Sequence, residues 1–478
     1  MKLASLTLAL IATGCGAGAA PLPPPRLPLV RTPDAGFRRM PEDVAIAPLT
    51  VPAVHEATLA SGFSVRVVPR RELPLVAIVV ASRALRAVDP EVSPGVAAMT
   101  ARVIERELER IAVSDAGREL PPPEVTVTSD GFLISTQVPS SELGRALSQI
   151  SAVLRSDDCY DGDVELSRLA QRAAAQRAHT VGGLAEVVAW RVLYGDSDRR
   201  AVPAWGSEAI VEQIGRVHCA MQRRRGLVPN ETVIAIVGDV GAEEAVRRVE
   251  ETMAAWQRPA APIPILGAPT FPIAPQNVIL VPSRSEQGMV MLVERGPGPR
   301  DPGYAAFGVL ARLVGGMFAA RLNLELRERR GWAYGVAAER RAAADHSTLR
   351  IECTVHGSRV LETLDAIELE LGRLSRADRI EEDELAIAIS AERSSLLHRL
   401  ESRSGIARSI GVAWLHGLEI DHLAAQDRAL ASLTARDVAG VAAAVRVGAA
   451  PVVLIGPPAL ASTIHRSRPG RFVMLSTQ

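Results

Sequence analysis

Histidine spacing gives the first test for a metal site in this chain. The sequence holds nine histidines, and no two are four residues apart, the spacing that places two imidazoles on one face of a helix. His416 and His422 are six residues apart across a glycine, and His218 stands alone. We therefore predict no zinc site built from a histidine pair and interpret these histidines as ordinary surface or capping residues.

The cysteines show no paired spacing of the kind found in zinc knuckles or redox motifs. Cys159, Cys219 and Cys353 are far apart in the sequence. They are interpreted as small apolar residues of the core, while one disulfide among them stays an alternative in an oxidising compartment.

Length and composition predict a large globular protein without nucleic-acid affinity. The chain has 478 residues, and 47% of them are hydrophobic, enough to bury large cores. Lys plus Arg and Asp plus Glu both number 54. Because no net charge attracts phosphate, nucleic acid is excluded as an expected partner.

The N-terminal residues are typical of an export signal. A charged start precedes an apolar run that ends at Ala12 and is too short to span a bilayer. Small residues then precede Cys15, as in a lipoprotein cleavage site. We predict that Cys15 is lipidated and anchors an exported, periplasm-facing protein to a membrane. Ordinary cleavage near Ala19 or Ala20 is the alternative.

The rest of the chain consists of two halves in which the predicted strands and helices follow in the same order. Each half opens with strands, continues with a helix, returns to strands and then becomes helical before a closing strand. Long helices are expected over 163–193 in the first half, and over 304–329 and 381–414 in the second. A hairpin turn is expected at Ser129-Asp130-Gly131.

This order predicts an α+β fold with two homologous domains, each a mainly antiparallel sheet covered by helices on one face. The predicted parts are an export signal at 1–20, a Pro-rich tether at 21–50, a first domain at 51–257, a Pro-rich linker at 258–275, a second domain at 276–460 and a tail at 461–478.

Several motifs at fixed spacings resemble the insulinase, or pitrilysin, family of zinc peptidases, which includes the mitochondrial processing peptidases. In the first half these are Ser61-Gly62-Phe63-Ser64-Val65 and Leu193-Tyr194-Gly195. The strongest match lies in the second half, where Gly315-Gly316 is followed by Arg321-Leu322 and then by Arg327 to Tyr334. The resemblance extends over about residues 58–457 and implies the fold of that family.

The resemblance also implies that the zinc motif has been lost. Active members carry His-x-x-Glu-His after a Gly-x-Ala, and the histidines bind zinc while the glutamate activates water. Here Gly95-Val96-Ala97 precedes Ala98, Ala101 and Arg102 at those positions, which cannot bind zinc. The family's downstream carboxylates are expected at Glu165 and Arg172, so that a cation replaces one of them.

Two substrate-binding residues of the family are kept in the second half. The resemblance implies that Arg327 and Tyr334 reach the bound peptide and its reacting carbonyl. The alternative is a purely structural role, in which Arg327 belongs to a charged helix end and Tyr334 packs in the following strand. In paired family members, one chain carries the zinc and the other carries this Arg and Tyr.

We therefore expect a non-catalytic subunit in the bacterial envelope, without a cofactor of its own, that contributes Arg327 and Tyr334 to a zinc-bearing insulinase-family partner acting on peptides. A stand-alone pseudopeptidase that binds peptides or serves as a scaffold is the first alternative. An active zinc peptidase with atypical ligands is the second.

Overall fold

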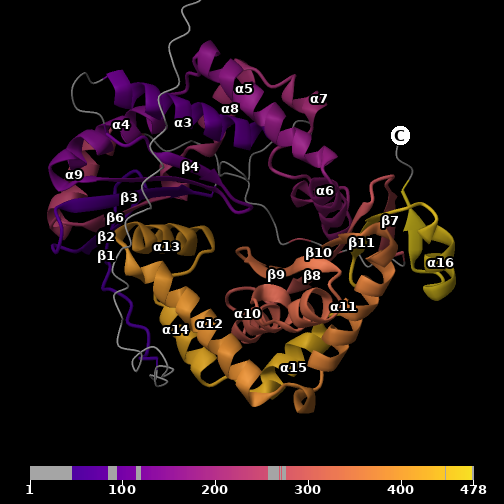
Figure 1. Cartoon of the computed structure of the whole chain (residues 1–478). Coiled ribbons are helices and arrows are strands. Elements are labelled where there is room, and N and C mark those ends of the chain that lie inside the picture. The colour runs from indigo at the N-terminus through magenta and orange to yellow at the C-terminus, as the bar shows by residue number, and fades with distance from the viewer. Residues whose placement is uncertain are drawn as a thin grey trace, which may run out of the picture. The chain divides into compact units, whose positions relative to one another are not determined.

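The computed structural model describes residues 46–83, 94–114, 120–256, 269, 271, 276–446 and 448–475. Alternating apolar residues form two six-stranded sheets, one from each half of the chain (Figure 1). The first sheet has the order β1-β2-β6-β3-β5-β4. Its strands are β1 (His55–Thr58), β2 (Ser64–Pro69), β3 (Leu75–Ser82), β4 (Glu124–Val127), β5 (Phe132–Pro139) and β6 (Thr232–Gly238).

The second sheet has the order β12-β7-β11-β8-β10-β9 and repeats five strands of the first. Its strands are β7 (Val278–Pro282), β8 (Gln287–Gly296), β9 (Ala333–Ala342), β10 (Ser347–His356), β11 (Val452–Gly456) and β12 (Phe472–Met474). The edge strands differ, because β1 pairs antiparallel with β2 whereas β12, from the end of the chain, pairs in parallel with β7. In each sheet the closing strand pairs in parallel with the opening strand and antiparallel with the next, through β2-β6-β3 in the first half and β7-β11-β8 in the second. The predicted α+β class with two homologous halves is therefore confirmed.

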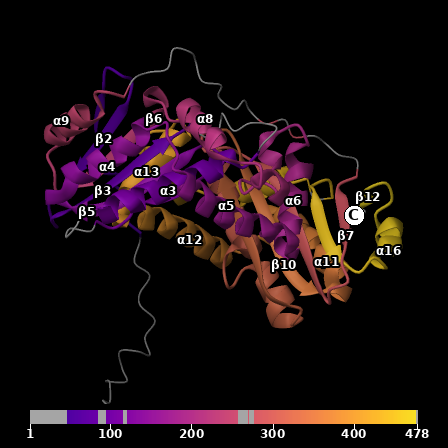
Figure 2. The ribbon, with the colours of Figure 1, turned by 90° about the horizontal axis from the view of Figure 1, so that it is seen from above.

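Helices cover the outer face of each sheet (Figures 1 and 2). They bury the apolar side of strands that would otherwise face water. The first half contributes α3 (Val96–Ser114), α4 (Leu143–Arg155), α5 (Asp161–Ala175), α7 (Glu208–Val211), α8 (Arg216–Gly226) and α9 (Ala242–Met253). The second contributes α10 (Tyr304–Ala311), α11 (Val360–Leu374), α12 (Glu382–Glu401), α14 (His422–Ala431), α15 (Ala435–Ala444) and α16 (Leu460–Ser467).

One helix from each half crosses to the inner face of the other half's sheet. Helix α6 (Val181–Tyr194) packs on β8 and β11, and α13 (Arg403–Leu415) packs on β3 and β6. Figure 1 shows α13 beneath the first sheet, and Figure 2 shows it running beside β3. Both faces of each sheet are therefore covered, whereas the sequence predicted helices on one face only.

The two crossing helices begin where the sequence predicted uninterrupted helices. Thr180 accepts a hydrogen bond from Gly183 N at 3.0 Å and caps α6, which separates it from α5. Ser402 accepts one from Gly405 N at 2.9 Å and separates α13 from α12 in the same way. A hydroxyl cap ends one helix and starts the next in a new direction, so each predicted helix is two.

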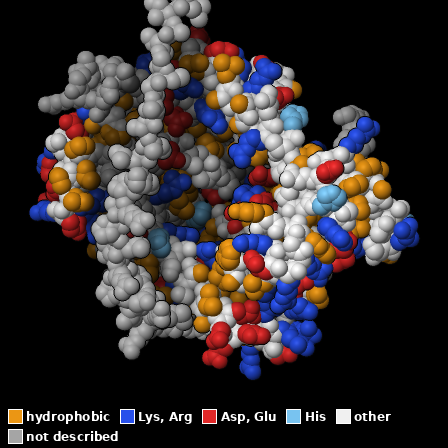
Figure 3. Space-filling model, in the orientation of Figure 1, with side chains coloured by type: hydrophobic (Ala, Val, Ile, Leu, Met, Phe, Trp, Pro, Cys, Tyr) orange, Lys and Arg blue, Asp and Glu red, His pale blue; other side chains and the backbone are white. Residues whose placement is uncertain are grey.

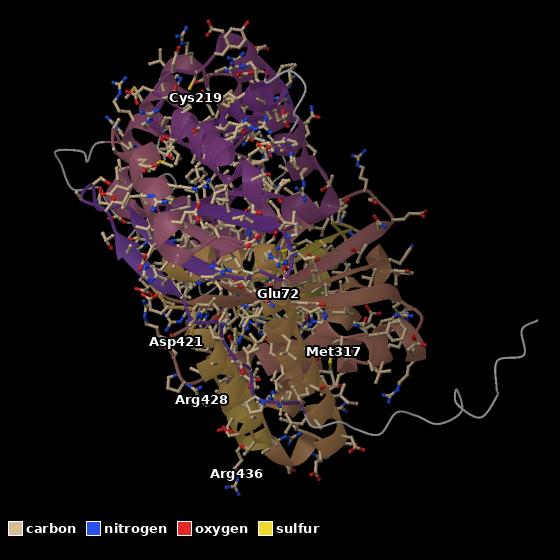
Figure 4. The ribbon with its side chains drawn as sticks, turned by 90° about the vertical axis from the view of Figure 1, so that its left-hand side faces the viewer. Glu72, Cys219, Met317, Asp421, Arg428 and Arg436 are labelled. Carbon is tan, nitrogen blue, oxygen red and sulfur yellow. The ribbon has the colours of Figure 1, made fainter. Side chains whose placement is uncertain are left out.

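Polar contacts join the halves within residues 48–478, which form one compact unit. Asp130, in the turn between β4 and β5, accepts a hydrogen bond from Ala344 N at 3.1 Å and pairs with His416 at 3.4 Å. At the opposite end of the first sheet, Arg403 pairs with Glu72 at 3.0 Å, and Figure 4 shows Glu72 at the boundary of the halves.

The end of the chain returns to the second sheet. The stretch 461–478 was predicted to be a tail, but it completes α16 and supplies β12, which pairs in parallel with β7. Across the described part of the chain, no helix has the length and apolar character needed to cross a membrane.

Candidate functional site

Helix α3 carries Ala98, Ala101 and Arg102, the positions at which the resemblance predicts the zinc motif of active insulinase-family members. The start of α3 lies against the loop that contains Gly206, since a Cβ on Gly95 would come within 3.1 Å of Gly206. Gly95 also has φ +104°, a backbone conformation that favours glycine. On the next turn, Ala98 is half-buried and Ala101 is 3% exposed. These two positions therefore offer methyl groups where a metal would need donor atoms.

The second ligand position is occupied by an arginine that is already hydrogen-bonded. Arg102 Nε donates to Gln171 Oε1 at 2.8 Å, and Gln171 Nε2 donates to Trp205 O at 2.9 Å. Gln171 is 1% exposed, so this chain of hydrogen bonds is shielded from water. Arg102 thus places a hydrogen-bonded guanidinium at the position predicted for the second histidine.

Arg172 does not occupy the position that the sequence predicted for it. Its guanidinium pairs with Glu212 at 2.8 Å, and both side chains are about half exposed, at 51% and 50%. Glu165 pairs with Arg168 one turn further along α5. It is Gln171 that faces α3, so the expected repulsion comes from Arg102 and not from Arg172.

The residues present therefore do not fit a zinc ion. Alanine has no donor atom, and a guanidinium that stays protonated repels a dication. Among the residues that the structure describes, no group of three or more His, Cys, Asp or Glu side chains is placed to hold a metal.

Arg327 lies on a distorted helix. The helix expected over 304–329 is α-helical only to Ala311 and continues as the π-helical segments η5 (Arg312–Gly316) and η6 (Asn323–Arg329) with a break between them. Such segments are often found at functional sites. The Arg327 guanidinium lies 4.0 Å from the ring centroid of Phe318, which is 71% exposed, and pairs with Glu328 at 3.2 Å.

Tyr334 is turned into solvent by an irregularity in β9. In the pairing with β10, Tyr334 and Gly335 together face the single residue Thr354, which makes a β-bulge. A regular strand would place Tyr334 on the same face as the buried Val336. The bulge instead leaves Tyr334 98% exposed. Bulges that redirect a side chain in this way are common beside active sites.

Asn323 holds the bulge against the π-helical segment η6. Its Oδ1 accepts from Val336 N at 2.8 Å, and its Nδ2 donates to Val336 O at 3.1 Å and to Met317 O at 2.9 Å. The side-chain amide pairs with both backbone groups of Val336, as a neighbouring strand would. Sequence analysis missed Asn323, although it directly follows the Arg321-Leu322 pair that supported the resemblance.

The predicted site residues thus fall into two groups. Ala98, Ala101 and Arg102 share one face of α3 in the first half. Arg327 and Tyr334 lie on either side of a turn at Gly331, which has φ +64°, in the second half. The sixth predicted site residue, Cys15 with its lipid, lies outside the described residues.

The remaining cysteines are free thiols in the interior. Cys159, Cys219 and Cys353 are all buried, and Figure 4 shows Cys219 among the helices of the first half. Burial raises the pKa of Cys219 and of Cys353 to about 12. Thiols that stay protonated at neutral pH are poor nucleophiles, and the interpretation as core residues is confirmed.

Taken together, the repeated sheets and the α3 positions define a peptidase-like chain whose own ligand positions cannot hold zinc. The comparisons with known proteins agree with this class. Residues 225–392 match the model of the Peptidase M16 inactive domain, a region that contains both Arg327 and Tyr334.

Several relatives and solved structures that are similar to the chain are named as proteases or peptidases. An uncharacterized zinc protease of Streptomyces coelicolor is 30% identical over 242 residues, which are 49% of this chain and 52% of that protein. A protease from Helicobacter pylori has a TM-score of 0.75 at 15% identity, covering 85% of this chain and 100% of that one. A Peptidase M16 inactive domain from Pseudomonas fluorescens has a TM-score of 0.73 at 22% identity, with coverages of 84% and 98%.

Residues 225–392 match an M16 domain, in agreement with the resemblance to insulinase-family peptidases. The chain spans only 52 to 62% of the length of the curated relatives that it matches. The match with an inactive domain indicates a non-catalytic, peptidase-like chain.

Proposed function

We propose that the protein is a non-catalytic M16 subunit that binds peptides and contributes Arg327 and Tyr334 to a zinc-bearing partner of the same family. One observation carries the proposal, which is that a bulge held by Asn323 leaves Tyr334 98% exposed. A tyrosine held this far into solvent presents both its apolar ring and its hydroxyl to a bound peptide.

The chemistry of the two residues suits a bound peptide. The Arg327 guanidinium donates paired hydrogen bonds to peptide carbonyls, and the Tyr334 hydroxyl donates to an oxyanion that develops on a carbonyl under attack. Neither residue activates water, so hydrolysis requires a metal from another chain. The loss of ligands at Ala98 and Arg102 supports this division of labour.

The proposed location is the bacterial envelope, with the chain exported and held by a lipid on Cys15. The support for it is the apolar N-terminal run and the small residues before that cysteine. The zinc required for hydrolysis belongs to the partner, and this chain needs no cofactor.

Co-purification from native membranes tests the partnership. The chain should bring down a relative with His-x-x-Glu-His, and peptide cleavage and stoichiometric zinc should appear only in the complex. If no such relative copurifies, the chain is instead a stand-alone peptide-binding or scaffold protein.

Variants of the reconstituted complex test the two residues. Arg327→Ala and Tyr334→Phe should each lower peptide turnover by roughly 10 to 1000 fold, the scale of a lost oxyanion donor. Matched controls are Arg329→Ala, a 73% exposed neighbour, and Tyr160→Phe, a 63% exposed tyrosine of the first half. Equal turnover in test and control variants would reduce Arg327 and Tyr334 to structural residues.

A further inference from the structure

A cavity with both polar and apolar lining residues lies among elements from both halves of the chain. It has a volume of about 420 Å³ and is enclosed by the turn between β4 and β5 and by residues of α12, α13 and α14. Neither Arg327 nor Tyr334 lines it. In Figure 3, basic side chains and histidines gather in the hollow between the two halves.

Two arginines in this cavity lack an anionic partner. Arg399 comes from α12 and Arg408 from α13, and both side chains are exposed. Within the described ranges, neither forms an ion pair with a carboxylate. Both arginines line the same cavity, so an anion bound there would be attracted by two positive charges.

Asp130, the one carboxylate among the described residues that line the cavity, already has partners. Asp130 pairs with His416 and accepts hydrogen bonds from Ser129 Oγ at 2.8 Å and from Ala344 N. Burial opposes ionisation of Asp130, but these partners outweigh it and lower its pKa. Asp130 is therefore a charged group whose oxygens are occupied, and it leaves the two arginines unneutralised.

Glu392 is shared between two further guanidinium groups. It pairs with Arg340, which lines the cavity, at 2.8 Å, and with Arg312 at 3.0 Å. One negative charge thus faces two positive ones, which leaves a net positive charge behind the wall.

The pKa of His422, which also lines the cavity, is lowered in part by the same positive charges. Burial lowers the pKa of His422, and the charges of Arg399 and His416 lower it further, against the raising effects of the hydrogen bond to Glu419 O and of Asp421. Its Nδ1 lies 2.7 Å from Glu419 O and takes the donor role there, since a carbonyl can only accept. The other ring nitrogen is left for a ligand.

We propose that this cavity binds a carboxylate group of a peptide, with Arg399 and Arg408 as its main ligands. The guanidinium fork matches the two oxygens of a carboxylate, and bidentate pairing of this kind is strong and directional. The volume accommodates a carboxylate with part of its peptide chain.

Strand β9 connects this cavity with Tyr334. Arg340 and Ala342, at the end of β9, line the cavity, and Tyr334 lies near its start. Eight residues of strand, about 27 Å, separate Tyr334 from Ala342. An extended peptide with its carboxylate in the cavity would thus place a residue about eight positions away beside Tyr334. Only this placement of a peptide residue beside Tyr334 rests on the proposed function; carboxylate binding in the cavity does not.

Binding of labelled peptides to the isolated full chain tests the proposal. Fluorescence anisotropy would compare ten-residue peptides with a free C-terminal carboxylate, with an amidated end and neutral side chains, and with an amidated end and one glutamate. The variants are Arg399→Gln/Arg408→Gln and the control Arg436→Gln. Arg436 is an exposed arginine of α15 that Figure 4 shows at the far end of the second half.

The wild-type chain should bind a carboxylate peptide at least about 10-fold more tightly than the neutral amide, and the double variant should abolish that preference. Tighter binding of the peptide with a free C-terminus would show that the cavity binds the chain-end carboxylate. Tighter binding of the glutamate peptide would show that it binds a side-chain carboxylate. Equal binding of the neutral amide, or an equal loss in Arg436→Gln, would overturn the proposal. Because no partner is present, failure of the proposed partnership leaves this result intact.

Discussion

Replacing Asn323 with alanine is expected to release the edge of the second sheet and with it the orientation of Tyr334. Val336 is 5% exposed, so water does not replace the lost acceptor of its N–H group. An orphaned buried donor costs about 1–3 kcal/mol. The carbonyls of Val336 and Met317 also lose a hydrogen bond from Asn323 Nδ2. Their loss adds less to the free-energy cost, since Met317 O keeps a hydrogen bond from Ala320 N at 3.1 Å. The total is about 2–4 kcal/mol of local stability.

Hydrogen exchange measures this loss locally, which matters because chains of this size seldom unfold in a two-state manner. A loss of about 2 kcal/mol accelerates exchange of the Val336 amide about 30-fold. The matched control is Asn277→Ala, because Asn277 is 2% exposed and its side chain bonds Ala450 O at 2.6 Å and Arg471 Nε at 3.0 Å. Unchanged protection of 333–342 in Asn323→Ala would refute the assigned role of Asn323.

Two further predictions concern the lost zinc site and the pH dependence of stability. The variant Ala98→His/Arg102→His/Gln171→Glu should bind zinc. The same two histidines combined with Arg172→Glu should not, because Arg172 faces away from α3. Equal zinc content of the two variants by mass spectrometry would contradict this prediction. His422 has a lowered pKa when folded, so the unfolded chain takes up more protons and stability falls as the pH drops through the ordinary value of 6.5. His422→Gln should flatten the decline in melting temperature from about pH 7.5 to about pH 5.5, and an unaltered slope would exclude His422 as its source.

The fold could be predicted from the sequence because apolar periodicity and turn residues are local signals. The Ser129-Asp130-Gly131 turn and the repetition of the halves both follow from such signals. The crossing of α6 and α13 could not be predicted this way, since it depends on which sheet a helix packs against. Thr180 and Ser402 were nonetheless visible as capping residues within the supposed long helices.

The site was predictable only where motif spacing fixes the positions. Ala98, Arg102 and Tyr334 follow from such spacing. The side chains that hold them do not, because Gln171 and Asn323 act through contacts between separate elements. The resemblance placed a cation at Arg172, one residue from Gln171, which is the residue that contacts Arg102. A shift of one position on α5 turns a side chain by about 100° around the helix axis.

The cavity around Arg399 and Arg408 was likewise invisible in the sequence. These arginines are nine residues apart on two different helices, and the turn containing Asp130 comes from the other half of the chain. Only the folded chain shows that the neighbouring carboxylates are used by other partners.

The central claim is that this chain cannot supply its own metal for hydrolysis. Its most direct test is peptide cleavage by the isolated, zinc-supplemented protein, with and without a chelator, alongside a measurement of bound zinc. The account predicts substoichiometric zinc and no chelator-sensitive cleavage until a partner is added. Cleavage by the isolated chain that a chelator abolishes would contradict it.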